Sequence, residues 1–473
     1  MHVRRFPALL LVVGLLAFLP AFTNIRLTSL QPVDVALLLL LGFCSAKYLY
    51  AGFSFRISAD LSGLFKSYVL LLLLLFSLSM LASRLTFYPL EDASFLKRPV
   101  IYSLSKLLQF ASVVCGFLWA TNVFLQQKKI LLRALGVYWV TGVFSALYAI
   151  LCYLALSVSH SLFSSNSFLA GILGAYFFDG VLRARGFFNE GGPFGIYLVS
   201  VFVVGFLRRK MTRRSLGFAN VAILSLAFVL AASKAGFFAA ALLALYAVMS
   251  AASFRKKIAY LVFSIAILWG IASWLNFGAQ LSGYIYGFQN IDEQVAARGV
   301  DMNLVAGRIA ALYIVPKMIA AHPITGIGFG NYPLMRNDPH YLGVLPSIRY
   351  VEDVPGIGIP GIAAEMGIPA TLWLMLLMFI PYWAVRKRAS ILAIAAIYQP
   401  LAHTFAVQLT FFYPWFVSAC AFAASVYEPE LVRQKAAKSL YYMILRPDFA
   451  LYRFTPVSDS REAECSTATR LSR

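Results

Sequence analysis

The sequence predicts an all-α, polytopic integral membrane protein. Hydrophobic residues make up 61% of its 473 residues and charged residues only 12%, about half of the charged fraction of an ordinary soluble protein. The mean hydropathy is +0.78. The apolar runs lack the alternation of a barrel strand, and a helix satisfies its own backbone groups in lipid, so we expect helical spans.

About twelve apolar runs are candidates for spans, since a helix needs roughly 20 apolar residues to cross a hydrocarbon core about 30 Å thick. We expect the spans at residues 6–23, 33–53, 67–83, 101–124, 134–157, 193–207, 216–232, 235–252, 258–275, 357–382, 389–407 and 410–427. The first run follows Arg4 and Arg5 as a signal peptide would, but it has no small-residue cleavage site and is counted as a span. Residues 167–178 are too few to cross and are expected to form an interfacial or re-entrant segment.

Basic residues are distributed unevenly over the loops between these spans. The amino terminus and one set of alternate loops carry 18 Lys and Arg, with eight more from residue 428 onwards, whereas the other set carries 12 together with 10 acidic residues. By the positive-inside rule, both termini are expected in the cytoplasm. The net charge of +21 therefore reflects membrane topology, and no nucleic-acid partner is expected.

We expect one membrane domain over residues 1–427, which includes an external loop at 158–192 and a large external loop with short helices at 276–356. Residues 428–473 are expected to form a cytoplasmic tail that is partly interfacial and, after Pro456, disordered. No nucleotide-binding glycine loop is present, so no cofactor is predicted. The five cysteines, at positions 44, 115, 152, 420 and 465, have no metal-ligand spacing and indicate packing rather than a metal site or a disulfide framework.

Unusual polar residues fall on the external side of this topology. They occur in the loop RARGFFNEGGPFG, at the span junction SKAG, in the large loop, and at the start of the tenth span. The candidates for substrate binding are Arg183, Arg185, Lys234, Arg308, His322, Asn331 and Glu365, and the candidates for catalysis are Glu190, Arg308 and His340.

These residue types suit a substrate that carries phosphates on a lipid, because guanidinium groups bind phosphate oxygens bidentately and stay charged. The carboxylates and histidines are candidate bases, and a cationic clamp can stabilise a departing pyrophosphate without a metal. Structural interpretations stay open. The spans could be anchored at the lipid headgroups by Arg183, Arg185 and Lys234. Arg308 could lie on the solvent-exposed face of an interfacial helix, and His340 could be a solvated loop residue.

The motifs RARGFFNEGGPFG, SKAG, GRIAALYIVPKMIAAHPITGIGFGNYPL and AAEMGIPATLW, in this order, resemble the O-antigen ligase and O-antigen or exopolysaccharide polymerase family. The resemblance covers residues 183–367 and implies a GT-C-like membrane glycosyltransferase of the bacterial inner membrane. It implies undecaprenyl-pyrophosphate-linked glycans as substrates, a periplasmic active site, no metal, and a possible chain-length-regulating co-polymerase as partner. The family often has a His about nine residues before the Glu of its ExG motif, where this chain has Gly356, and this departure favours a polymerase over a ligase.

The resemblance thus predicts an inverting polymerase of lipid-linked repeat units, with external arginines on the pyrophosphate and Glu190 or His340 as the base. An O-antigen ligase that transfers glycan to lipid A core is the first alternative. A lipid-linked oligosaccharide flippase or another transporter is the second, and it would place polar residues near the middle of several spans. A non-catalytic assembly protein is a further alternative, which would not need the external cations.

Overall fold

The computed structural model describes residues 6–22, 31–51, 59–85, 98–158, 174–178, 181–249, 258, 282, 286, 289–298, 307–347, 357–386, 390–405 and 407–427. The chain divides into two compact units, Met1–Val426 and Tyr427–Arg473. The predicted cytoplasmic tail and, apart from Ile258, the predicted span 258–275 lie outside the described residues.

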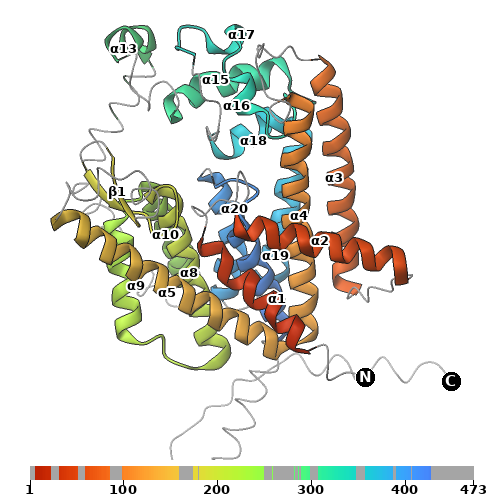
Figure 1. Cartoon of the computed structure of the whole chain (residues 1–473), viewed down its shortest axis with the longest axis vertical. Coiled ribbons are helices and arrows are strands. Elements are labelled where there is room, and N and C mark those ends of the chain that lie inside the picture. The colour runs from red at the N-terminus through yellow and green to blue at the C-terminus, as the bar shows by residue number, and fades with distance from the viewer. Residues whose placement is uncertain are drawn as a thin grey trace, which may run out of the picture. The chain divides into compact units, whose positions relative to one another are not determined.

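The first unit is mostly helical, and Figure 1 shows its long helices as a bundle. Its amino-terminal half contains α1 (Phe6–Phe18), the 3-10 turn η2 (Leu19–Ala21), α2 (Pro32–Ala51), α3 (Ala59–Leu85), α4 (Pro99–Gln126), α5 (Lys128–Val158), β1 (Ala175–Phe178) and β2 (Val181–Ala184). It continues with α8 (Gly191–Thr212), α9 (Phe218–Leu230), α10 (Lys234–Met249), α13 (Ile291–Arg298), α15 (Arg308–Ala321), α16 (Tyr332–Met335) and α17 (Pro339–Leu342). The last helices are α18 (Gly358–Met366), α19 (Ile368–Val385), α20 (Ser390–Thr404) and Phe412–Tyr427.

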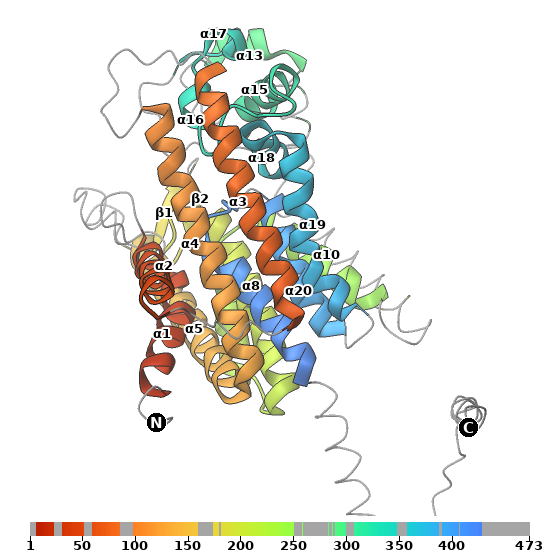
Figure 2. The ribbon, with the colours of Figure 1, turned by 90° about the vertical axis from the view of Figure 1, so that its right-hand side faces the viewer.

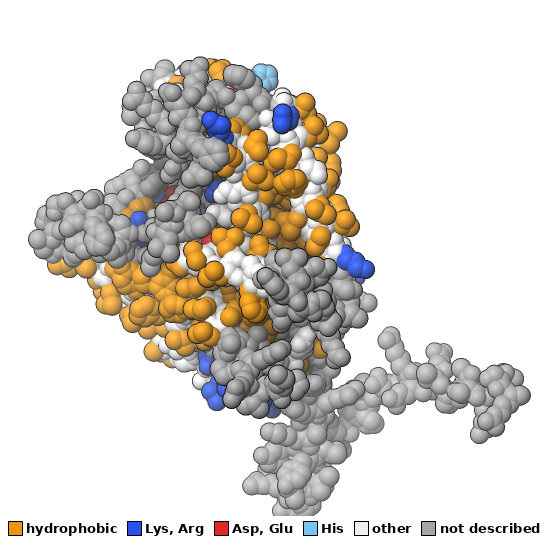
Figure 3. Space-filling view, turned by 45° about the vertical axis from the view of Figure 1, so that its right-hand side comes forward, with side chains coloured by type: hydrophobic (Ala, Val, Ile, Leu, Met, Phe, Trp, Pro, Cys, Tyr) orange, Lys and Arg blue, Asp and Glu red, His pale blue; other side chains and the backbone are white. Residues whose placement is uncertain are grey.

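Five helices of the described part are long and apolar enough to cross a membrane. They are Gly63–Leu85 within α3, and α4, α5, α8 and α19 in full. Large apolar side chains such as Leu70, Leu73 and Phe76 of α3 are exposed. On the face seen in Figure 3, hydrophobic side chains cover much of the described surface, with few charges among them. An apolar surface of this extent favours contact with lipid, so the protein is membrane-embedded.

Small residues let the long helices pack closely. A Cβ atom on Gly142 of α5 would collide with Val201 of α8, and one on Gly205 of α8 would collide with the ring of Trp139. Such close backbone approach is a common basis for helix association in membranes, where apolar side chains gain little from leaving lipid. The three cysteines of the described part, Cys115, Cys152 and Cys420, are not joined in disulfide bonds.

Two predicted elements differ from the structure. The expected span 357–382 is two helices, because the chain turns at Gly367, where φ is +78°. The expected all-α fold contains a small antiparallel hairpin, in which Tyr176 of β1 lies opposite Arg183 of β2. This hairpin takes up the end of the segment 167–178, which was expected to be interfacial or re-entrant, and residues 167–173 lie outside the described part.

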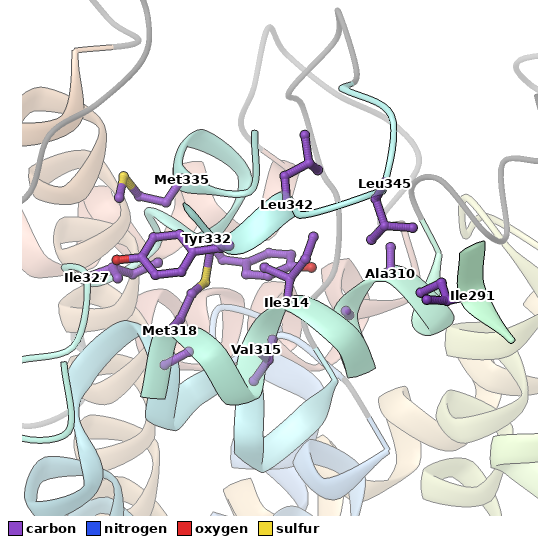
Figure 4. Close-up of a cluster of buried hydrophobic side chains, with 13 residues drawn as sticks. Ile291, Ala310, Ile314, Val315, Met318, Ile327, Tyr332, Met335, Leu342 and Leu345 are labelled. Atoms are coloured by element: carbon purple, nitrogen blue, oxygen red, sulfur yellow. The ribbon is translucent and has the colours of Figure 1, made fainter. Parts of the chain in front are cut away.

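The helices α15, α16 and α17, together called the cap, lie at one end of the bundle, beside the ends of α3 and α4 (Figures 1 and 2). The cap has its own apolar core, in which Ile314 and Met318 of α15 pack with Tyr332 and Met335 of α16 (Figure 4). Leu342 and Leu345 close this core from the segment of α17. The described residues of the large loop thus form short helices that pack as one layer.

Candidate functional site

The first polar group, the hairpin cluster, comprises Tyr176, Arg183, Arg185, Glu190 and Lys234. Cross-strand neighbours project from the same face of a hairpin, so Tyr176 and Arg183 lie side by side. The Arg185 guanidinium lies 5.4 Å from the centre of the Tyr176 ring, and its Nη1 donates to the Asn189 carbonyl at 3.2 Å. The Tyr176 hydroxyl accepts from the Gly191 amide at 3.3 Å, which joins the hairpin to the first residue of α8.

The electrostatics of the hairpin cluster follow from its partial burial. Burial lowers the pKa of the Arg185 guanidinium, although an arginine stays charged in proteins. Burial also raises the pKa of Tyr176 above its usual range, while Arg183 and Arg185 act against this rise. The cluster therefore presents two arginines around a neutral phenol, with the exposed Glu190 carboxylate close enough to raise the pKa of the same phenol.

Two adjacent phenylalanines fix the turn between Arg185 and Glu190. The ring of Phe187 stacks on Tyr148 of α5 with centroids 4.3 Å apart, and it also packs against Phe22. Phe188 points the other way and is fully buried against Tyr197 of α8, with ring centroids 5.0 Å apart. Because both phenylalanine side chains pack in the bundle, they fix the backbone positions of Arg185 and Glu190 on either side of them.

The SKAG junction packs directly on the start of α8. Ser233 accepts from the Gly236 amide at 3.0 Å, which caps α10, and its hydroxyl donates to the Gly192 carbonyl at 3.0 Å. A Cβ atom on Gly195 would collide with the Ser233 side chain. Lys234, the first residue of α10, is therefore held at the same end of α8 as Glu190.

Ser233→Ala is expected to lower the free energy of unfolding by about 1–2 kcal/mol, because it removes a helix cap and a hydrogen bond between two helices. Thermal denaturation of the protein in lipid nanodiscs measures the change. Ser157→Ala is the matched control, since its exposed hydroxyl bonds only within α5, and it should leave the midpoint unchanged. Equal midpoints for the two variants would show that the junction does not depend on this serine.

A second polar group lies on the cap around Tyr341. His322 Nε2 lies 2.9 Å from the Tyr341 hydroxyl, and the His340 ring lies 5.1 Å from the Tyr341 ring. Lys317 donates to the Tyr341 carbonyl at 3.3 Å and lies over the ring of Tyr313. Burial and then the nearby His340 lower the pKa of His322 below its usual range, so at neutral pH its imidazole is neutral and can act as a base or a hydrogen-bonding partner.

The glycine-rich segment Gly326–Tyr332, here called the docking loop, lies against the junction of α18 and α19. The Ile327 amide donates to the Ala364 carbonyl at 2.9 Å, and the Tyr332 amide donates to Glu365 Oε1 at 3.3 Å. The Phe329 amide donates to Ser79 Oγ of α3 at 3.1 Å. These bonds attach the docking loop, which connects α15 to α16 of the cap, to α3 and α18.

Glu365 is a half-buried acid with a shifted pKa. Loss of water around its carboxylate raises the pKa to about 7, while the amides of Gly330 and Tyr332 and the ammonium of Lys106 act in the opposite direction. Asn331 is fully buried in the same loop and donates to the Ile327 carbonyl at 3.3 Å. Both residues were expected to bind substrate. The side-chain hydrogen bonds that the structure describes for Glu365 and Asn331 are made with residues of the docking loop.

The structure thus assigns the expected site residues to two regions. Arg183, Arg185, Glu190 and Lys234 share the end of α8, whereas His322, Asn331, His340 and Glu365 belong to the cap and its docking loop. In Figures 1 and 2 the hairpin lies nearer the middle of the bundle than the cap does. Arg308 begins α15, but its side chain lies outside the described residues.

Several residues of these groups were not anticipated from the sequence. Tyr176 and Tyr341 lie next to the predicted cations and histidines, and Lys106 reaches the docking loop from α4. Arg336 is fully buried beside Tyr332, and burial lowers its pKa. A sequence signal existed for Lys106, since an ionisable residue in an apolar run favours a specific role.

In the part of the chain that the structure describes, His, Cys, Asp and Glu side chains do not gather in groups that could hold a metal ion. No protein-family model matches the chain, and no curated protein is significantly similar to it in sequence. The fold defines the class as a mostly helical membrane-embedded protein, with a cationic hairpin cluster at one end of α8 and a histidine-bearing cap.

Proposed function

We propose that this protein polymerises undecaprenyl-pyrophosphate-linked oligosaccharide repeat units into exopolysaccharide or O-antigen. The reaction would take place on the periplasmic face of a bacterial inner membrane, by inverting glycosyl transfer. The proposal rests on the family resemblance of residues 183–367 together with one structural observation. Two loops that are separate in sequence bring Arg183, Arg185, Glu190 and Lys234 to one end of α8.

The charges at the two ends of α8 support this orientation. The opposite end continues into Arg208, Arg209, Lys210, Arg213 and Arg214, a cluster typical of a cytoplasmic turn. The hairpin cluster then falls on the periplasmic side, where lipid-linked glycans are polymerised in the proposed pathway. The layout with twelve spans, a GT-C-like bundle and cytoplasmic termini belongs to the same proposal.

The proposed chemistry is a direct displacement at the anomeric carbon. A hydroxyl oxygen at the non-reducing end of one lipid-linked repeat forms a bond to the anomeric carbon of the growing chain, while the bond from that carbon to undecaprenyl pyrophosphate breaks. The leaving pyrophosphate takes the bonding electron pair, and Arg183, Arg185 and Arg308 stabilise its charge. The hydroxyl proton passes to a base, and the configuration at the anomeric carbon inverts.

Glu190 is the proposed base. Its side chain is exposed and its carboxylate makes no capping hydrogen bond to the start of α8. Glu190 also shares the hairpin cluster with the proposed phosphate ligands. His340 is the alternative base and is exposed on the cap. Lys234 and His322 are proposed to contact the pyrophosphate or the glycan.

A gene deletion complemented with variants tests this function. Wild-type protein should restore polymer, whereas Arg183→Ala and Arg308→Ala should leave single lipid-linked repeat units on the periplasmic side at normal protein levels. Full restoration of polymer length and yield by both variants would refute the proposal that Arg183 and Arg308 stabilise the leaving pyrophosphate. Repeat units stranded on the cytoplasmic side would indicate a flippase, and loss of only the attachment of finished chains to lipid A core would indicate a ligase.

A further inference from the structure

The docking loop meets two charged residues from different helices. Lys106 belongs to α4 and Glu365 to α18, and 258 residues of sequence lie between them. A Cβ atom on Gly330 would lie 2.6 Å from Lys106 Cγ, so the lysine stem runs directly along the loop backbone. The Lys106 ammonium lies 5.4 Å from the centre of the Tyr102 ring and acts electrostatically on Glu365.

The Glu365 carboxylate is bonded to the loop from the other side. It accepts from the Tyr332 amide at 3.3 Å and from the Gly330 amide. The titratable and charged groups that act on Glu365 from neighbouring elements are Lys106 of α4 and Tyr332 of α16. The loop backbone is therefore enclosed between a cation of the bundle and an acid of α18.

We propose that Lys106 and Glu365 are positioning residues that control the docking of the Gly326–Tyr332 loop, with the loop docked most firmly when Glu365 carries a proton. Once Glu365 ionises, Lys106 provides the charge that keeps the loop in place. The docking loop leads directly into α16, whose Tyr332 and Met335 belong to the apolar core of the cap. The pair thereby sets the position of the cap over the bundle, whatever reaction the protein performs.

The direction of the pH dependence follows from linkage. The docked Glu365 has a pKa of about 7, against an ordinary value of 4.5 in water. Because the pKa is higher in the docked state, protonation of Glu365 stabilises docking. This stabilisation is complete below about pH 4.5 and is lost as the pH rises through about 7. Such a difference in pKa corresponds to a change in the docking equilibrium of up to about two orders of magnitude.

Hydrogen exchange of the full-length protein in lipid nanodiscs tests the inference. The Ile327, Phe329, Gly330 and Tyr332 amides all donate hydrogen bonds in the docked loop, so protection of peptides covering them reports docking. After correction for the intrinsic exchange rate, wild-type protection of this segment should fall at least tenfold between pH 5 and pH 8. Glu365→Gln keeps an oxygen acceptor but cannot ionise, so its protection should stay constant over this range.

Matched variants distinguish the effect of the Lys106 and Glu365 charges on docking from the effect of changing any charge on the protein. Lys106→Met should lose more protection at pH 8 than the wild type, and Lys106→Met with Glu365→Gln should again show no pH dependence. Glu293→Gln in α13 and Lys129→Met in α5 change exposed charges elsewhere and should behave as the wild type does. A wild-type protection factor that does not vary with pH, or a pH dependence that persists in Glu365→Gln, would overturn the inference. Because exchange is measured without substrate, either result is independent of glycan transfer.

Discussion

Arg185→Ala is expected to lower the rate of glycan transfer about 100-fold, a loss of roughly 3 kcal/mol of transition-state stabilisation. The guanidinium is partly desolvated and is held by the Tyr176 ring and the Asn189 carbonyl, so it meets a developing phosphate charge without having to reorganise. Arg185→Lys should recover only part of the rate, because an ammonium lacks the planar fork that binds two phosphate oxygens. The measurement is kcat/KM of protein reconstituted with lipid-linked repeat units.

Arg209→Ala is the matched control for this variant. Arg209 is an exposed residue near the opposite end of α8, so its loss should change kcat/KM less than twofold. If Arg185→Ala also stayed within twofold of the wild type, the hairpin cluster would not be the site of charge stabilisation. Arg185 would then anchor the hairpin to the bundle.

Gly367→Ala is expected to cost about 3 kcal/mol or more of folding free energy. The residue has φ of +78°, where a side chain costs about 1–2 kcal/mol, and its Cβ atom would overlap the Ile324 carbonyl. Relief of that overlap would disturb the bond from the Ile368 amide to the Pro323 carbonyl, at 2.8 Å. We therefore expect a thermal midpoint several degrees lower in nanodiscs, with increased proteolysis of the segment 322–336 before the bundle unfolds.

Gly136→Ala provides the comparison for this prediction. Gly136 lies within α5 with open space where the added methyl group would lie, so alanine should stabilise the helix slightly or leave it unchanged. A Gly367→Ala protein as stable as Gly136→Ala would show that the chain can relax around residue 367. The division between α18 and α19 would then not depend on this glycine.

The membrane helices could be predicted from the sequence because apolar length is a local property. Ten of the twelve expected spans each coincide with one helix of the described residues, and 357–382 divides into α18 and α19. Only five helices of the described part meet the length and hydropathy required of a span. The turn at Gly367 was missed because apolar residues continue on both sides of it. The hairpin was missed although Asp179-Gly180, a pair typical of tight hairpin turns, separates its two strands.

Which residues lie together in each polar group was harder to predict from the sequence than where the helices lie. Arg183, Arg185 and Glu190 are neighbours in sequence, and their common loop indicated one group before the fold was known. The partnership of Lys106, Glu365 and the Gly330 backbone depends on the packing of α4 against a loop more than 200 residues away, and one sequence carries no trace of such a contact. The contact of Tyr341 with His322 likewise depends on the fold of the cap.

Reconstitution with a defined substrate tests the central proposal most directly. Purified protein in nanodiscs, supplied with a single kind of undecaprenyl-pyrophosphate-linked repeat unit and no nucleotide, should produce a ladder of longer lipid-linked glycans and release undecaprenyl pyrophosphate. The Arg185→Ala protein should produce about 100-fold less in the same time. Folded wild-type protein that leaves the repeat units unextended, or that only moves them across the bilayer of a vesicle, would contradict the proposed polymerase.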